Sequence, residues 1–361
     1  MKANIENTAL LTNQKKPILI AGPCSAETEQ QVITTAKSIA AVDKNIIYRA
    51  GIWKPRTRPN AFEGIGRIGL NWLQKVTVET GLRTATEVAT AEHVEECLRA
   101  GIHLLWIGAR TTVNPFSVQE IAEALRGTDI PVLVKNPVTP DLQLWIGAFE
   151  RLYKCGVTRL GAIHRGFHSH NITPFRNDPM WNLAIDLKTS CPDLPIICDP
   201  SHICGSRELI PYIAQKAMDM DMQGLMIETH CMPDIAWSDA KQQITPSALK
   251  QLLDSLVIRK SRPSEPVSVS QLDSLRNRID KTDDELLHLL MNRMKVSEQI
   301  GTYKRTNNIT ILQSNRWEEL LSNRMEAGAI MGLSEDFVRQ LYLLIHEESI
   351  RKQDAIMNLS T

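Results

Sequence analysis

Short apolar runs alternate with longer polar stretches along the first 240 residues of the chain. Eight such runs are four to seven residues long, and helix-sized segments separate them: Pro17–Ile20, Asn45–Tyr48, Leu82–Thr86, His103–Ile107, Ile130–Val134, Val157–Ile163, Leu194–Cys198 and Gln223–Ile227. Runs of this length are typical of strands, and their spacing is typical of repeated βα units. Eight units predict an α/β fold of the (β/α)8 TIM-barrel type.

Polar residues stand at the ends of the apolar runs. Each run is followed by a residue capable of chemistry: Cys24, Arg49, Glu87, Arg110, Lys135, Arg165, His202 and Glu228. Helix packing also scatters polar residues, but it does not put one at the end of every strand-sized run. Because barrels build their active sites at the carboxyl ends of the strands, we expect an enzyme whose site lies at that mouth.

Composition and charge limit the partners of the protein. The 361 residues suffice for a barrel of about 250 residues and a smaller second domain. Forty-one basic and 41 acidic residues give a formal net charge of zero, so no overall field attracts nucleic acid or a membrane. Seven cysteines without a CxxC pair argue against a disulfide framework, and no apolar stretch reaches the roughly 18 residues of a membrane span. We therefore expect a cytoplasmic protein without nucleic-acid or membrane partners.

One domain boundary is visible in the sequence. Residues 259–270, with the sequence RKSRPSEPVSVS, hold two prolines and four serines and show no apolar periodicity. This composition predicts an extended linker between a barrel domain, residues 1–258, and a helical domain, residues 271–361. About 16 residues precede the first apolar run, so we expect no N-terminal regulatory domain.

Four potential metal ligands come from neighbouring parts of the predicted barrel. Cys24 lies in AGPCS, His202 in DPSH and Glu228 in IETH, at the ends of the first, seventh and eighth strands, and Asp239 follows in the last loop. Each alone would be read as a structural residue. Together, a thiolate, an imidazole and two carboxylates predict a site for a divalent transition metal such as Mn²⁺, Fe²⁺, Co²⁺ or Zn²⁺.

Cationic residues form a second group at the same mouth. They stand at strand ends or directly after them: Arg49, Lys54, Arg56, Arg110, Lys135 and Arg165. Like charges repel unless anions neutralise them, so the group predicts anionic substrates, and arginine suits carboxylate and phosphate. The alternative is a solvated rim of unrelated charges.

At these residues the chain resembles 3-deoxy-D-arabino-heptulosonate 7-phosphate (DAHP) synthase, from about Pro17 to about Leu256. The motifs are AGPCS, RAGIWKPRTRP, ATEV, IGART, LVKNP, HRGF, DPSH and ETH with a following SD. That family condenses phosphoenolpyruvate with erythrose 4-phosphate in the shikimate pathway. The resemblance implies that the metal ligands are Cys24, His202, Glu228 and Asp239, that phosphoenolpyruvate is held by Arg49, Lys54, Arg110, Lys135 and Arg165, and that the aldose phosphate meets Arg56 and Thr57.

The implied chemistry assigns further roles. A metal would polarise the aldehyde, Lys54 would donate a proton to the developing alkoxide, and Glu87 would position the attacking water. Two rivals stay open. The sister synthase uses arabinose 5-phosphate, although the KPRT motif, in place of an Asn-containing KAN-type motif, favours the four-carbon aldose. A Schiff-base aldolase would use Lys135 as its nucleophile.

The tail begins with a long helical pattern. From Val269 to the break at Thr306–Asn308, apolar residues recur at near-helical spacing: Leu272, Leu275, Ile279, Leu286, Leu290, Met294 and Ile300. Such a helix is about 50 Å long, whereas a domain of about 90 residues has a radius of gyration near 12 Å. The helix therefore needs a partner, and we expect at least a homodimer. Two shorter helices are predicted at Ser314–Glu326 and Ser334–Asn358.

Polar residues on these helices resemble those of the all-helical, three-helix chorismate mutase over Gln271–Gln353. Arg293 and Lys304 lie eleven residues apart on one helix face, and Ser349 and Gln353 pair one turn apart. The resemblance implies that chorismate is bound by Arg276, Arg293, Lys304, Arg316, Ser349 and Gln353. Lys304 and Gln353 would address the breaking ether oxygen during rearrangement to prephenate. Trp317 and Gln313 depart from the family's usual glutamate and aspartate.

The sequence therefore predicts a bifunctional enzyme with DAHP synthase and chorismate mutase activities. The alternative is a monofunctional synthase whose helical tail is a regulatory or dimerisation module binding chorismate or prephenate. Fusion of an early pathway enzyme to a later one suggests that prephenate, formed or bound at the tail, inhibits the barrel.

Overall fold

The computed structural model describes residues 17–54, 62–169, 173–259 and 266–358. The chain divides into two compact units, Met1–Ser261 and Arg262–Thr361. Among the described helices, none is both long enough and apolar enough to cross a membrane.

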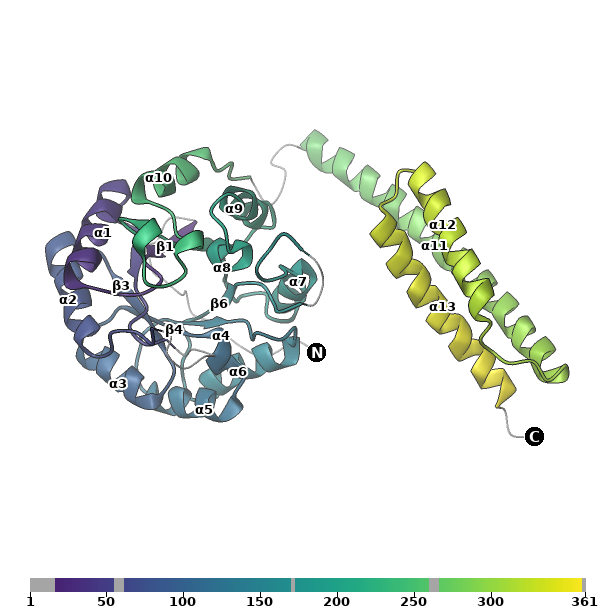
Figure 1. Cartoon of the computed structure of the whole chain (residues 1–361), viewed down its shortest axis with the longest axis horizontal. Coiled ribbons are helices and arrows are strands. Elements are labelled where there is room, and N and C mark those ends of the chain that lie inside the picture. The colour runs from purple at the N-terminus through teal and green to yellow at the C-terminus, as the bar shows by residue number, and fades with distance from the viewer. Residues whose placement is uncertain (1–16, 55–61, 170–172, 260–265, 359–361) are drawn as a thin grey trace. The chain divides into compact units, whose positions relative to one another are not determined.

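The first unit is a closed barrel of eight parallel strands, which confirms the predicted TIM-barrel fold. The strands follow one another around the barrel, and β1 pairs with β8 to close it (Figure 1). They are β1 Ile18–Gly22, β2 Ile47–Arg49, β3 Thr84–Val88, β4 Leu104–Ile107, β5 Val132–Lys135, β6 Leu160–His164, β7 Ile196–Cys198 and β8 Gly224–Glu228.

Each strand overlaps one predicted apolar run and begins one to three residues later than that run. Leu82, Val157 and Leu194 are buried although they precede the paired segments. The apolar pattern records burial, which starts before the hydrogen-bonded ladder does, and this explains the difference.

The longer helices form the outer layer of the barrel (Figure 1). They are α1 Glu29–Val42, α2 Ile68–Thr80, α3 Ala91–Arg99, α5 Pro115–Ala124, α6 Leu142–Lys154, α7 Trp181–Ser190, α9 Ile210–Asp219 and α10 Pro246–Ser255. Shorter helical segments follow the strand ends: α4 Ala109–Thr112 after β4, α8 Pro200–Cys204 after β7, and the 3₁₀ turns η1 Pro233–Ile235 and η2 Ala240–Gln242 after β8. Thr28, Asp141 and Thr245 cap α1, α6 and α10 by accepting backbone N–H bonds.

Two apolar cores hold the barrel together. A large one lies between the sheet and the helices, and a small one fills the barrel interior with residues such as Leu104, Trp106, Ile163 and Met226. The small core closes the barrel below the carboxyl ends of the strands. Polar side chains at those ends are therefore confined to one mouth.

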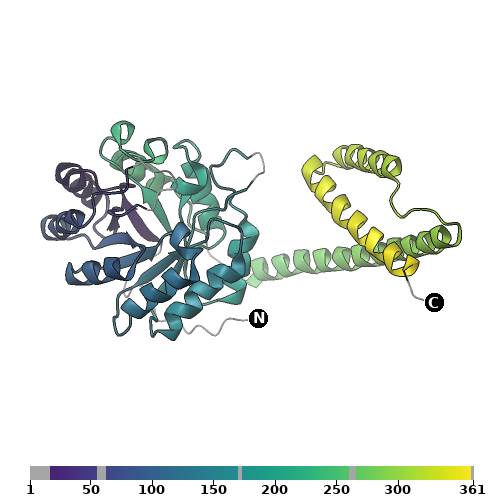
Figure 2. The ribbon, with the colours of Figure 1, turned by 60° about the horizontal axis from the view of Figure 1, so that its bottom comes forward.

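The second unit contains α11 Pro266–Thr306, α12 Ser314–Ile330 and α13 Glu335–Met357 (Figure 2). The 41 residues of α11 span about 60 Å at the usual helical rise. The stretch 259–270, expected to be extended, is helical from Pro266 onward, because a proline fits the first turn of a helix where no N–H partner is needed. Helix α13 packs along α11, and a Cβ on Gly301 would lie only 3.0 Å from Gln353 Cα.

Candidate active sites

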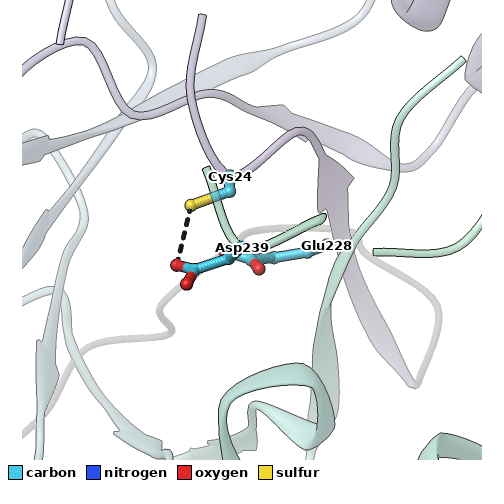
Figure 3. A group of neighbouring side chains, drawn as sticks. All are labelled: Cys24, Glu228 and Asp239. Carbon is cyan, nitrogen blue, oxygen red and sulfur yellow. Dashed lines mark hydrogen bonds between the residues drawn. The ribbon is translucent and has the colours of Figure 1, made fainter. Parts of the chain in front are cut away.

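Three potential metal ligands meet at the barrel mouth. Cys24 follows β1, Glu228 ends β8 and Asp239 lies in the loop after β8, and one ligand atom from each lies within 4.8 Å of the others. Cys24 Sγ donates a hydrogen bond to Asp239 Oδ2 at 3.3 Å, as Figure 3 shows. Gly22 permits this arrangement, since its φ of 150° is open to glycine and a Cβ there would lie 2.0 Å from Arg49 O.

His202, the fourth predicted ligand, lies beside this cluster. Its Nε2 is 3.7 Å from Glu228 Oε1, and its Nδ1 is 2.8 Å from Asp199 Oδ2. Metal-bound histidines are commonly held in this way, with one ring nitrogen on a carboxylate and the other facing the ion. The position of His202 therefore fits a ligand role.

Electrostatics at the cluster favour a bound cation. Burial, reinforced by Glu228 and Asp239, raises the pKa of the Cys24 thiol to about 12. Burial alone would raise the pKa of both carboxyl groups, but His202 outweighs it, together with Arg49 at Glu228 and Arg176 at Asp239, so both pKa values lie below their usual range. Glu228 Oε1 is buried and has no hydrogen-bond partner among the described residues. Two charged carboxylates and a thiol that must lose its proton are what a divalent metal requires.

The predicted cations converge on the same mouth. The Arg49 guanidinium is fully buried, lies 4.9 Å from the centre of the Trp106 ring and comes within 3.4 Å of Glu228. Its Nε and Nη1 are buried without hydrogen-bond partners among the described residues. Lys135 Nζ lies 3.0 Å from Asp199 Oδ2. Donors left unpaired in a buried site are free to bind oxygen atoms of an anion.

Arg165, Lys54 and Arg110 complete the described part of this cationic group. Burial lowers the pKa of Arg165 to about 10, and the positive charges of Arg176 and Arg110 act in the same direction. The positive charge of Lys54 lowers the pKa of Cys24, and Arg110 is exposed on the short α4. Arg56 and Thr57 lie outside the described residues.

Glu87 is the residue expected to position water, and its carboxylate lies inside the barrel mouth. Its carboxylate accepts a hydrogen bond from Trp106 Nε1 at 3.0 Å. It packs on Gly108, where a Cβ would lie 2.1 Å from Glu87 Oε1. Glycine at this position therefore leaves space for the carboxylate.

In the helical unit, four of the six predicted chorismate residues are brought between helices. Arg293 donates a hydrogen bond to Ser349 Oγ, and Lys304 donates one to Ile311 O. Gln353 is buried, and its Oε1 has no hydrogen-bond partner among the described residues. Lys304 and Gln313 line a pocket of about 360 Å³.

Arg276 and Arg316 are exposed instead. Arg276 pairs with Asp273 at 3.2 Å and Arg316 with Glu319 at 2.9 Å, each on its own helix. The structure therefore does not bring these two arginines to the other four residues within the chain.

Comparison with known proteins decides the family. Residues 1–261 match the model of the DAHP synthetase I family, and residues 275–354 match chorismate mutase type II. The chain belongs to the DAHP synthetase I family. The two matches indicate both enzyme activities, DAHP synthase and chorismate mutase, within aromatic biosynthesis.

Relatives of this DAHP synthetase I family member include two kinds of aldolase. Phospho-2-dehydro-3-deoxyheptonate aldolase of Thermotoga maritima is 28% identical over 66% of this chain and 68% of its own length. The 2-dehydro-3-deoxyphosphooctonate aldolase of Vesicomyosocius okutanii is 27% identical over 66% and 88%. The crystal structure of the Thermotoga maritima DAHP synthase superposes with a TM-score of 0.62 at 25% identity, covering 69% of this chain and 72% of that one.

Sequence reasoning missed several residues of the family member's two sites. In the barrel, Asp199 holds both Lys135 and His202, and its position directly before the PSH of DPSH was a usable signal. In the helical unit the missed residue is His346, whose ring stacks on that of Trp317 with ring centres 3.8 Å apart. Burial lowers the pKa of His346, as do the charges of Arg293 and Lys304, so these residues share one environment. His346 lies one turn before Ser349, a spacing that could have revealed it.

Proposed function

We propose that the barrel condenses phosphoenolpyruvate with erythrose 4-phosphate to DAHP and phosphate, using a divalent metal. The observation that carries this proposal is the Cys24–Glu228–Asp239 cluster, in which Cys24 and Glu228 are buried, beside Arg49, whose Nε and Nη1 have no hydrogen-bond partner among the described residues. The thiolate favours Mn²⁺, Fe²⁺, Co²⁺ or Zn²⁺ over a cation that prefers oxygen ligands alone. Cys24, His202, Glu228 and Asp239 would hold the metal, which supplies a Lewis acid for the aldehyde.

The residues around that cluster would bind and orient the substrates. Arg49, Lys135 and Arg165, with Arg110 at the rim, would neutralise the phosphate and carboxylate of phosphoenolpyruvate. Carbon C3 of phosphoenolpyruvate then forms a bond with the aldehyde carbon, water adds at C2, and phosphate leaves by C–O cleavage. Lys54 would protonate the new alkoxide, a role supported by the effect of its charge on Cys24, and Glu87 would hold the water.

The choice of aldose depends on the KPRT motif, of which Arg56 and Thr57 would meet the aldose phosphate. Relatives of both kinds are similar to this chain, so we base the assignment to erythrose 4-phosphate on this motif. Engagement of Lys135 with Asp199 favours anion binding over Schiff-base chemistry. Borohydride added with both substrates should therefore leave no adduct on Lys135.

For residues 271–361 we propose chorismate mutase activity in a homodimer. Arg276 and Lys304 lie 28 residues apart on one unbroken helix, which separates them by about 42 Å. No ligand of about 10 Å can touch both in one chain. Apolar side chains exposed along α11 would be covered by the partner: Leu286, Leu287, Leu289, Met291, Val296 and Ile300.

Removal of the metal tests whether condensation takes place in the barrel and chorismate rearrangement in the helical unit. Brief chelation should abolish condensation and leave chorismate turnover unchanged, because the proposed metal ligands all lie in the barrel. Added Mn²⁺ or Co²⁺ should restore condensation, and Cys24→Ala should not respond to either ion. Condensation that survives complete chelation would refute metal dependence. If the intact protein does not turn over chorismate, the helical tail is a binding module and not a mutase.

Two further assignments belong to this proposal. The seven cysteines all lie in the described part of the chain and none is in a disulfide, which supports a reducing, cytoplasmic location. We also propose that prephenate inhibits the barrel. Unchanged condensation kinetics at saturating prephenate would eliminate that regulation.

A further inference from the structure

Two adjacent residues in the loop between β6 and α7, Arg176 and Asn177, contact both halves of the barrel site. Their backbone N–H groups donate to Cys204 O and Ile203 O at 3.2 and 3.1 Å. Asn177 Nδ2 donates to His202 O at 2.6 Å. These are the last three carbonyls of α8, which have no partners within the helix itself. The two residues therefore cap the short helix that carries His202.

The Arg176 side chain reaches the metal cluster. One terminal nitrogen, Nη1, donates to Asp239 Oδ1 at 2.9 Å and to Gln242 Oε1 at 2.7 Å. Gln242 Nε2 in turn donates to Glu228 Oε2 at 2.7 Å. Arg176 thus holds one carboxylate of the cluster directly and the other through a buried glutamine.

Asp239, unlike Glu228 at the end of β8, is held by a loop. It has a left-handed backbone conformation, with φ of 48°, and lies in a loop rather than at a strand end. Arg176 binds Oδ1, while Oδ2 faces Cys24. The carboxylate is therefore oriented with one oxygen toward the cluster and the other on the arginine.

The Asn177 side chain faces the anion-binding half. Arg165 Nη1 donates to Asn177 Oδ1 at 2.8 Å, and Asn177 is buried. Gly166, with φ of 75°, allows this approach, since a Cβ there would lie 2.8 Å from Asn177 O. Asn177 thus sets the direction of Arg165.

We propose that Arg176 and Asn177 are positioning residues with separate duties: Arg176 orients the metal ligands and Asn177 orients the arginine that binds phosphoenolpyruvate. This inference rests on the proposed function of the barrel. It adds that neighbouring residues on one helix cap serve two binding events, one mainly through the Arg176 side chain on Asp239 and the other mainly through Asn177 Oδ1 on Arg165.

Metal affinity tests the first duty without any turnover. Co²⁺ is titrated into the metal-free full-length protein, and its absorption bands, including the thiolate-to-cobalt band, report binding. Loss of a residue that orients a metal ligand typically costs 10–100-fold in affinity, so we expect about that loss in Arg176→Gln, with a smaller loss in Arg176→Lys. Arg99→Gln removes an exposed arginine–glutamate pair on α3 and should bind Co²⁺ as the unaltered protein does.

Phosphoenolpyruvate affinity tests the second duty. Isothermal titration with saturating Co²⁺ should show about a tenfold weaker Kd in Asn177→Ala, because the charge-assisted bond that directs Arg165 is lost. The same measurement on Arg176→Gln, with enough Co²⁺ to fill its site, should change by less than about threefold. Melting temperatures of the metal-free variants identify any that are merely unfolded, and Arg176→Lys and Asn177→Asp then replace them.

The outcomes distinguish failure of this inference from failure of the proposed function. Normal Co²⁺ affinity in Arg176→Gln, or equal losses of both ligands in both variants, would overturn the inference while leaving the proposed function intact. Unaltered protein that shows no thiolate–cobalt band would refute the metal site itself, and the inference with it.

Discussion

At the scale of single residues, the barrel mouth contains charged side chains that are buried next to groups of opposite charge. Asp199 is fully buried, yet its neighbours His202 and Lys135 outweigh burial and hold its pKa well below the usual range. Removing one partner from such a pair leaves the other charge without compensation. Substitutions here should therefore affect both ligand binding and stability.

Lys135→Ala should raise KM for phosphoenolpyruvate and lower kcat/KM by about 10–100-fold. It removes one charge-assisted contact, worth about 1.5–3 kcal/mol. The melting temperature should also fall, because Asp199 loses its partner at 3.0 Å. Steady-state kinetics and a thermal melt measure the two effects. Lys44→Ala, an exposed lysine just before β2, is the control, and an equal loss there would contradict the strand-end assignment.

His164 should make the barrel sensitive to acid. Burial, assisted by the charge of Arg165, lowers its pKa to about 3, against about 6.5 in an unfolded chain. Between these pH values His164 is protonated in the unfolded state and neutral in the folded state. The free energy of unfolding is therefore at its full value above about pH 6.5 and falls as the pH drops toward 3. His164→Leu should lose less free energy of unfolding between pH 7 and pH 4.5 than the unaltered protein, as measured by urea unfolding. Parallel losses in both proteins would show that His164 does not contribute.

At the scale of elements, the mutase half depends on how closely two helices approach. Gly301 on α11 faces Gln353 on α13, and a Cβ would already lie 3.0 Å from Gln353 Cα. A larger side chain must push α13 away and displace Gln353 with it. Displacement by about 1 Å can cost about 100-fold in rate.

Gly301→Val should therefore lower mutase kcat by at least about tenfold while condensation continues. Gly147→Ala is the matched control, because it also replaces a glycine within a helix, but nothing lies within 4 Å of the added Cβ. Assays of both activities on both variants measure the difference. A Gly301→Val protein with normal mutase activity would show that the close contact between α11 and α13 is dispensable.

At the scale of the whole molecule, the length of α11 makes the proposed mutase site a shared one. Arg276→Ala and Lys304→Ala homodimers should each be nearly inactive as mutases, because every site lacks one residue. When the two variants are mixed and refolded together, half of the dimers are mixed, and each mixed dimer has one site with both lesions and one without. Mutase assays should then recover about a quarter of the normal sites. No recovery despite demonstrated subunit exchange would exclude the shared site.

The strands and the mouth could be predicted because each depends on short-range patterns. Eight apolar runs identified eight strands, and the βα alternation determined their order around the barrel. Because parallel strands end on one side, Cys24, Arg49 and Glu228 had to share a mouth wherever their loops went. The linker was harder, since residues 266–270 have loop-like composition yet belong to α11.

The sequence by itself therefore determined the barrel, the helical tail and which strand ends carry the candidate site residues, since short apolar runs and a 3.6-residue periodicity are local properties. Only the tertiary structure decided which side chains contact and orient one another. These contacts are Asp199 after β7 with Lys135 of β5 and with His202, Arg176 of the β6 loop with Asp239 of the β8 loop, and Asn177 with Arg165. Such contacts depend on side-chain directions after the barrel closes, and no spacing along the chain encodes them.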